Sequence, residues 1–453
     1  MSEAIKRKGA MSDERDGAPA YWSERTERPT RGGHPASNSG RNHRTPIDDC
    51  TAADQWSGRM IAFKEIRLKF TSIEPLKYGA NAAAEFDDPS WPRFIRITDV
   101  DTNGQLRDDT FRSLPPEIAE PFRLQVGDIL LARSGATVGK SFIYEESWGD
   151  ACYAGYLIRL RTSDHYSSRY IYWCLQSSKY WADIEANLIQ STIQNVSAER
   201  YASFRVPSPP LTTQHRIAQF LDEKTTQIDR LIEKKRALLD RLAEKRQALI
   251  TRAVTKGLNP NAPMKPSGID WVGNIPAHWG VKPLQRMVDL QRGHDLPSQE
   301  RNEGDILVIS SAGPSGNHNL AVSQGPGIIT GRYGTIGKFY LIEQPYWPLN
   351  TTLYSKSIVC LPRYGWRLLQ AMAHLFVLNS LKSAVPGIDR NDVTSERVPS
   401  PPEDEQIVIA EFIESSLKYE DRRVEKVEQS IKLLKEYRGA VITAAVTGQL
   451  ELA

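Results

Sequence analysis

Apolar residues recur at alternating steps of four and three in two long segments of the chain. The first series is Leu221, Thr225, Ile228, Ile232, Lys235, Leu239, Leu242, Arg246 and Leu249. The second series is Ile413, Leu417, Glu420, Val424, Val427, Ile431, Leu434, Arg438 and Val441. This spacing is the heptad pattern of a coiled-coil seam, interrupted here by polar residues. It predicts two long helices, each with one face suited to pairing.

The two helical segments belong to a longer repeat. The run Arg-Val-Pro-Ser-Pro-Pro begins at Arg205 and again at Arg397, and the pairs that follow keep this separation of 192 positions without a gap as far as Thr255 and Thr447. Such a repeat is much longer than those of solenoids or propellers, so it indicates a duplicated domain with its connecting helix. The paired prolines predict a helix start. Gly257 and Gly448 stand where each helix would end.

The connections predict how the two helices run. A helix of about 45 residues rises roughly 65–70 Å, more than a compact domain needs, so the two helices are expected to pair. A short linker, residues 258–268, follows the first helix and places the next globular region at its far end. The second helix must then run back, which predicts an antiparallel pair with one domain near each end. The alternative is that each helix only caps its own domain.

Charge agrees with pairing between the two helices. The first helix carries a basic set, and the second carries an acidic one. The basic residues are Lys234, Lys235, Arg236, Arg241, Lys245 and Arg252. The acidic residues are Glu411, Glu414, Glu420, Asp421, Glu425 and Glu428.

Two globular regions of similar pattern accompany the helices, and each combines short β-rich runs with helical stretches. Strands are expected near 94–97, 129–132 and 142–144, then near 306–309, 327–330 and 339–342. Helices are expected near 170–175, 181–188 and 366–380. The fold class is therefore α+β, with two duplicated mixed α/β domains separated by long antiparallel helices. The expected boundaries are 60–204 and 281–396 for the domains, 205–257 and 397–453 for the helices, and 258–280 for the linker.

Residues 1–59 differ from the rest because Arg, Gly, Pro, Ser and Asp dominate them. Such a segment buries too little surface to offset its ordering entropy, so a disordered extension is expected. A basic arm that touches DNA is the alternative, but acids such as Asp13, Glu14 and Glu24 dilute it.

Composition excludes little by itself. The chain has 453 residues and a formal charge of +3, with a pI near 8.5, so it is only mildly basic. Cys50, Cys152, Cys174 and Cys360 are scattered without zinc-site spacing, and no secretory signal precedes them, so reduced cytoplasmic thiols are expected. No apolar run approaches the length of a membrane span.

A related glycine motif occurs once in each domain. It runs from Arg133 to Lys140, and again, one residue shorter, from Arg332 to Lys338. A phosphate-binding loop needs four residues between its first glycine and Gly-Lys, followed by a helix. Here only three intervene and a strand is expected next, so the motif predicts a glycine-bounded turn between strands. Arg133, Lys140, Arg332 and Lys338 either contact DNA phosphates or remain solvated.

No catalytic or metal-binding constellation is recognisable in the sequence, and no methyl-donor motif occurs. Polar clusters at 291–294, 310–311 and 317–319 are suited to base edges, with an ordinary surface loop as the alternative. The base-contacting residues expected from them are Gln291, Arg292, Ser311, Asn317 and Asn319.

The repeated pattern resembles a known family. Residues 206–257, with Val-Pro-Ser-Pro-Pro and Ala-Val-Thr-Lys-Gly, look like a conserved region of the specificity subunits of type I restriction-modification enzymes. Residues 264–279 resemble the segment that leads into their second recognition domain. The resemblance runs from about residue 60 to the end, and residues 1–59 depart from it.

The resemblance implies a non-catalytic subunit without cofactor or metal of its own. Each recognition domain would contact half of a bipartite, asymmetric double-stranded DNA target. The helices would dock two methyltransferase subunits that use S-adenosylmethionine. A restriction subunit would use ATP and Mg to translocate and cut. The alternatives are a duplicated scaffold that spaces protein partners without DNA, and a fused methyltransferase that has lost its motifs.

Overall fold

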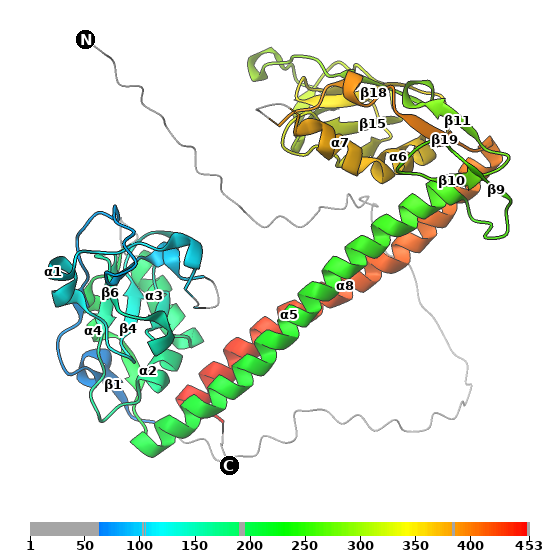
Figure 1. Ribbon diagram of the computed structural model, residues 1–453. Helices are drawn as coiled ribbons and strands as arrows, with labels where there is room; N and C mark the ends of the chain where they lie inside the picture. The colour runs from blue at the N-terminus through cyan, green and yellow to red at the C-terminus, as the bar shows by residue number, and fades with distance from the viewer. Residues whose placement is uncertain (1–62, 102–103, 105, 190–194, 383–385, 451–453) are drawn as a thin grey trace, which may run out of the picture. The chain divides into compact units, whose positions relative to one another are not determined.

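Figure 1 shows a computed structural model of the chain, which describes residues 63–101, 104, 106–189, 195–382 and 386–450. These residues form two α+β domains and two long helices. The segment predicted as a disordered extension, 1–59, lies outside the described ranges, as does Cys50.

The first domain is built on an antiparallel sheet with strand order β2-β7-β4-β5. Its two central strands are fully buried, because Ile129–Ala132 and Leu157–Leu160 are almost wholly apolar. The sheet strands are β2 (Lys77–Tyr78), β4 (Ile129–Ala132), β5 (Ser141–Ile143) and β7 (Leu157–Leu160). The remaining strands are the parallel pair β3 (Arg93–Ile95) and β6 (Ala151–Tyr153), and the antiparallel pair β1 (Glu65–Arg67) and β8 (Arg205–Pro207). The α-helices are α1 (Pro116–Ala119), α2 (Ser168–Cys174), α3 (Ser178–Ile189) and α4 (Ala198–Ser203).

The second domain repeats this topology, with an antiparallel sheet in the order β12-β18-β15-β16. These strands are β12 (Val288–Arg292), β15 (Gly327–Gly331), β16 (Phe339–Ile342) and β18 (Thr352–Ile358). The parallel pair recurs as β13 (Ile306–Ser310) and β17 (Tyr346–Pro348), with β14 (Gly313–His318) added beside β13. The closing pair recurs as β11 (Gly280–Pro283) and β19 (Arg397–Ser400). The duplication inferred from the sequence is therefore confirmed at the level of strand order.

The helix expected at 366–380 is two helices, so that prediction was partly wrong. They are α6 (Pro362–Ala371) and α7 (Ala373–Ser380). The chain leaves helical geometry at Met372, whose ψ is 1°, and the Met372 side chain is fully buried in the second core. Packing of this side chain accompanies the break, and no proline or glycine marks it in the sequence.

The long helices are α5 (Leu211–Lys256) and α8 (Glu403–Thr447), of 46 and 45 residues. Each follows a proline pair, as predicted, with Pro210 or Pro402 as its N-cap. Each ends at a glycine with positive φ, 70° at Gly257 and 78° at Gly448, a conformation that other residues adopt only with strain. The segment 205–257, assigned to the first conserved helix, begins with strand β8, because its prolines keep the chain extended until the helix starts at Leu211.

The two helices run antiparallel. As residue numbers rise along α5, those of the ion-pair partners fall along α8: Asp229 pairs with Arg438 at 3.0 Å, and Arg246 pairs with Asp421. Every residue of both predicted heptad series is buried or half-buried, which confirms the seam. The two ion pairs occupy equivalent positions in the two repeats, so the helix pair has an internal two-fold relationship.

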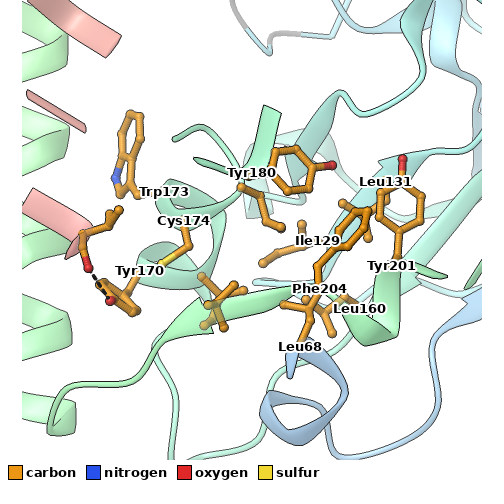
Figure 2. Packing of buried hydrophobic residues seen from close by; sticks show 14 of the residues in the cluster. Leu68, Ile129, Leu131, Leu160, Tyr170, Trp173, Cys174, Tyr180, Tyr201 and Phe204 are labelled. Carbon is orange, nitrogen blue, oxygen red and sulfur yellow. Dashed lines mark hydrogen bonds between the residues drawn. The ribbon is translucent and has the colours of Figure 1, made fainter. Parts of the chain in front are cut away.

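Each helix contributes to both domain cores, so the alternative of helices that cap only their own domains was wrong. The first core joins Leu221 near the start of α5 with Ile442 near the end of α8. The second joins Val254 near the end of α5 with Ile413 near the start of α8. In the first core, Figure 2 shows Cys174 of α2 between Tyr170 and Trp173 on one side and the strand residues Ile129, Leu131 and Leu160 on the other.

Equivalent hydrogen bonds fasten each domain to the helix pair. Tyr170 donates its hydroxyl hydrogen to the Val446 carbonyl of α8, and Tyr364 donates to the Val254 carbonyl of α5, both at 3.2 Å. Gln214 and Gln406, near the two helix starts, each accept a backbone N–H from the adjoining domain at 2.9 Å. The same contacts thus hold both domains, with the roles of α5 and α8 exchanged.

The segment predicted as a linker, 258–280, is mostly part of the second domain, so this boundary is corrected. It contains the antiparallel strands β9 (Met264–Pro266) and β10 (Asn274–Pro276). Ile275 and Trp279 are fully buried, and the Trp279 indole donates to Glu405 of α8 at 3.0 Å. The segment folds because its apolar side chains fill the space between the end of α5 and the start of α8.

Glu420 breaks the equivalence of the two repeats. It is a buried carboxylate on the α8 seam, at the position that Ile228 holds in α5. Lys245 of α5 donates to it at 2.8 Å and Arg423 at 3.0 Å. The hydrogen bond from Lys245 is the main influence holding the pKa of Glu420 below its ordinary value of 4.5, against the opposing effect of burial.

We predict that Glu420→Gln destabilises the chain at neutral pH by about 1 kcal/mol, the scale of a charge-assisted hydrogen bond to a partly exposed lysine. Because the folded pKa is depressed, the stabilisation is present above about pH 4.5 and is lost as pH falls through the folded value. Thermal melts of both proteins from pH 7 to pH 3 should therefore converge. Glu425→Gln, at an exposed α8 position, is the control and should behave like wild type. A Glu420→Gln difference that persists unchanged at pH 3 would contradict the prediction.

Candidate nucleic-acid interface

The glycine motif forms equivalent turns in the two domains. The first turn, 133–140, connects antiparallel strands β4 and β5, and the second, 332–338, connects β15 and β16. Gly139 and Gly337 have φ values of 88° and 82°, so each turn needs glycine at this point. The predicted glycine-bounded turn between strands is confirmed, and no helix follows it as a phosphate-binding loop would require.

Buried tyrosines fix the first turn. Tyr201 donates to the Ala132 carbonyl at 2.6 Å and accepts the Gly139 N–H at 3.1 Å, so it spans both ends of the turn. Tyr180 donates to the Gly139 carbonyl at 2.7 Å. Burial raises the pKa of Tyr201 to about 12, so its hydroxyl remains a donor at neutral pH. Buried hydrogen bonds from two tyrosines therefore hold both ends of the first turn in place.

Arg133 and Arg332 occupy the same place in the two domains. The Arg133 N–H donates to Tyr156 at 3.0 Å, and its carbonyl accepts from Val196 at 2.8 Å. The Arg332 N–H donates to Thr351 at 2.8 Å, and its carbonyl accepts from Ile388 at 3.1 Å. Each arginine thus bridges the residue that precedes β7 or β18 and a segment near the end of its domain.

Their side chains are also held. The Arg133 guanidinium lies 4.7 Å from the centre of the Tyr78 ring, and its Nε donates to Asn195 at 3.4 Å. The Arg332 guanidinium lies 5.2 Å from the Tyr333 ring centre, and its Nε donates to the Ile388 carbonyl at 3.3 Å.

Arg133 lines a cleft of about 460 Å³ on the first domain. Its walls combine a basic side chain, tyrosine rings and amides, which can contact phosphates or base edges. The lining residues are Tyr78 to Ala82, Arg133, Ser134, Ala154 to Tyr156, and Asn195. No sequence motif indicated Tyr78, Asn81, Tyr156 or Asn195 of this cleft.

Each domain has a glycine at the equivalent of this cleft, Gly79 in the first and Gly293 in the second, and this shared glycine could have indicated the neighbouring Tyr78. A Cβ on Gly79 would lie 2.3 Å from the Tyr153 carbonyl oxygen, and one on Gly293 would lie 2.1 Å from that of Leu349. The Gly79 N–H donates to the carbonyl of Leu157, the first residue of β7. The Gly293 N–H donates to the carbonyl of Thr352, the first residue of β18. Tyr78 and Arg292 precede these glycines and are therefore equivalent. The glycine that follows each of them is the sequence feature that the two domains share here.

The other predicted site residues fall into two groups. Ser311 lies beside the second turn, since its carbonyl accepts the Thr335 hydroxyl and its N–H donates to Thr351 at 3.2 Å. Arg292 of β12 pairs with Leu353 of β18, and the backbone N–H groups of Ser311 and Arg332 both donate to Thr351, which precedes β18. The structure therefore brings these three residues around the start of β18. Arg292 and Lys338 are exposed, whereas Lys140 and Gln291 are half-buried.

Asn317 and Asn319 are separate from this group. Both are exposed, but Asn317 pairs with Leu307 at the end of the β13–β14 hairpin opposite its Gly313 turn. Asn317 lies four positions along the strand from Gly313, which corresponds to roughly 13 Å.

Within the described residues, no group of His, Cys, Asp or Glu side chains could hold a metal ion. Burial raises the pKa of Cys152 and Cys174 to about 12, so these thiols are poor nucleophiles. None of the described helices is both long and apolar enough to cross a membrane.

Comparison with known proteins gives one family. The model of the type I restriction modification DNA specificity domain matches residues 97–241 and 276–432, which together exceed half of the chain. The EcoDI type I restriction enzyme specificity subunit of Escherichia coli is 23% identical over 184 residues. That alignment covers 39% of this chain and 40% of the relative, so the chain spans about two fifths of the curated relative's length in this match.

A solved structure shares the fold. A chain from a structure reported as the basis of complex assembly and conformational transition of the type I R-M system matches with a TM-score of 0.68. The identity is 13%, over 87% of this chain and 100% of that one. The HsdS subunit from Thermoanaerobacter tengcongensis matches at 14% identity over 86% and 97%, with a TM-score of 0.48. Since the specificity-domain model matches both halves of the duplication, the chain belongs to the type I restriction-modification DNA specificity family.

Proposed function

We propose that this chain is the sequence-specific DNA-binding subunit of a type I restriction-modification complex and performs no chemistry itself. The observation that carries the proposal is the match of one DNA specificity domain to each half of the duplicated fold. Each domain contacts one half of a bipartite, asymmetric double-stranded target. The equivalent turns support this, because both carry an arginine and a lysine at matching positions, whereas the side chains around them differ between the two domains.

The proposed contacts divide by chemistry. Arg133, Lys140, Arg332 and Lys338 lie on the two turns, where their charge suits the DNA backbone. Ser311 lies beside the second turn, and Gln291 and Arg292 lie on β12, opposite Tyr354 and Leu353 of β18. These three residues are proposed to contact base edges. Asn317 and Asn319, on the separate hairpin, are proposed as further base contacts of the second domain.

The proposed partners are two methyltransferase subunits and a restriction subunit, in the cytoplasm. The methyltransferase subunits use S-adenosylmethionine, and the restriction subunit uses ATP and Mg. Exposed apolar side chains where α5 ends and α8 begins support docking of one partner: Leu258, Val408 and Phe412. At the other end of the helix pair, Phe220 holds the position equivalent to Phe412, but Phe220 and Leu450 there pack half-buried against the first core. The second partner is proposed from the two-fold repeat of the helix pair.

The first test uses the complex assembled with methyltransferase subunits. We expect sequence-dependent DNA binding, and a methylome with one bipartite motif. The chain alone, given S-adenosylmethionine, ATP and Mg, should show neither methylation nor cleavage. A complex that assembles but binds all DNA alike would support the alternative, a scaffold that only spaces protein partners. Turnover by the isolated chain would contradict the non-catalytic assignment.

A second test treats the helix pair as a ruler for the spacing between half-sites. Deletion of residues 231–237 together with 423–429 removes one heptad from each helix, about 10 Å of length. Both deleted segments lie between the two equivalent ion pairs, Asp229–Arg438 and Arg246–Asp421, so these pairs keep their register. Since duplex DNA advances about 3.4 Å per base pair, the spacer should shorten by up to about three pairs.

The half-site sequences should stay the same in this variant, because no residue of the turns or of the cleft is changed. Methylome mapping of cells that express the variant complex measures both properties together. Deletion of 231–237 alone is the control, and it should abolish methylation because it shifts the ion pairs out of register. An active double deletion with the original spacer would show that the helices do not set the spacing.

A further inference from the structure

We infer that Arg133 and Arg332 are preorganised bidentate clamps, one in each domain, for a DNA group that presents two acceptor atoms side by side. Two such groups exist on DNA: the O6/N7 edge of guanine and a pair of phosphate oxygens. The inference rests on the proposed function and deepens it, because a solvated basic residue would contribute only charge, whereas a clamped one also imposes geometry.

The argument begins with the first domain. The Arg133 guanidinium lies over the Tyr78 ring and Asn195 accepts its Nε–H, so two independent contacts restrict the orientation of the group. Its terminal nitrogens have no hydrogen-bond or ion-pair partner among the described residues. Since the side chain lines the cleft, these donors are available to a ligand there.

The second domain reaches the same state with different residues. Tyr333, next in sequence, replaces Tyr78 as the stacking partner of Arg332, and the Ile388 carbonyl replaces the Asn195 amide as the Nε acceptor. Gly387 holds the position equivalent to Asn195, and a Cβ there would lie 2.7 Å from the Tyr333 ring, so glycine makes room for it. Here too the terminal nitrogens have no such partner within the part of the chain that the structure describes.

Two different solutions to one geometric requirement indicate that the requirement is functional. A free arginine loses much rotamer freedom when it binds, but a stacked arginine with an anchored Nε has already lost part of it. The guanidinium fork then presents two parallel N–H groups that lysine cannot reproduce. A contact that depends only on charge would tolerate lysine, which gives the inference a direct test.

The experiment uses the full complex with methyltransferase subunits and a duplex that carries the motif found in its methylome. Arg133→Lys and Arg133→Ala should each weaken binding by about 5- to 150-fold, the range of one bidentate contact. Arg332→Lys and Arg332→Ala should do the same for the other half-site. Asn195→Ala, which removes only the Nε anchor, should give a smaller loss. Arg107→Lys is the matched control, because the exposed Arg107 guanidinium already donates to Asp109. This variant should bind like wild type.

Modified duplexes then identify the acceptor. If the acceptor is guanine, 7-deazaguanine at one position of the matching half-site weakens the wild-type complex and has no further effect on the Arg133→Ala complex. If the acceptor is a phosphate, a methylphosphonate at one linkage has this pattern instead, and the salt dependence of binding falls by about one ion in the variant. Either pattern supports the clamp.

Other outcomes overturn it. If Arg133→Lys and Arg332→Lys bind the motif duplex like wild type, the clamp is wrong while the proposed function stands. The same holds if each variant weakens both half-sites equally. If the wild-type complex shows no sequence-dependent binding, both the proposed function and the clamp are overturned. Thermal melts of each variant distinguish loss of contact from loss of folding.

Discussion

The antiparallel pairing of α5 and α8 is the constraint on which both domains depend. Neither domain completes its core from its own segment alone, because each takes apolar side chains from the start of one long helix and the end of the other. The Tyr170 and Tyr364 hydrogen bonds repeat this arrangement at the level of single atoms. A register shift along the seam would therefore misplace core residues in both domains, and would also separate both Asp–Arg pairs.

The frameworks of the two domains are alike, and the differences concentrate around the turns. Strand order, the closing strand pair and the backbone bridges of Arg133 and Arg332 recur. By contrast, buried Tyr201 supports the first turn, whereas Val393 holds the equivalent position in the second domain. There the Thr335 hydroxyl and Ser311 brace the turn instead. Since the braces differ while the strands do not, the surface around each turn can diverge with little effect on the fold.

The sequence predicted most of what local patterns encode. Heptad spacing gave both helices and their seam, the proline pairs and glycines gave their ends, and the glycine motif gave the two turns. It failed where distant segments meet. Tyr78 and Asn195 flank Arg133 from opposite ends of the domain, so no local pattern connects them. Trp279 was assigned to a linker because its burial depends on the start of α8, and the break at Met372 depends on packing in the second core.

Glu420 shows what the duplication gained by diverging. Suppose that two α8 helices from separate chains met in the register that α5 and α8 use. The Asp421–Arg438 pairs would form twice, and nothing in them would oppose the mistake. Glu420, however, would face Tyr437, which holds the position equivalent to Lys245, and its buried carboxylate would keep Arg423 alone. An unpaired or half-paired buried charge is costly. One acidic residue on the seam therefore favours pairing of α8 with α5 over pairing of two α8 helices.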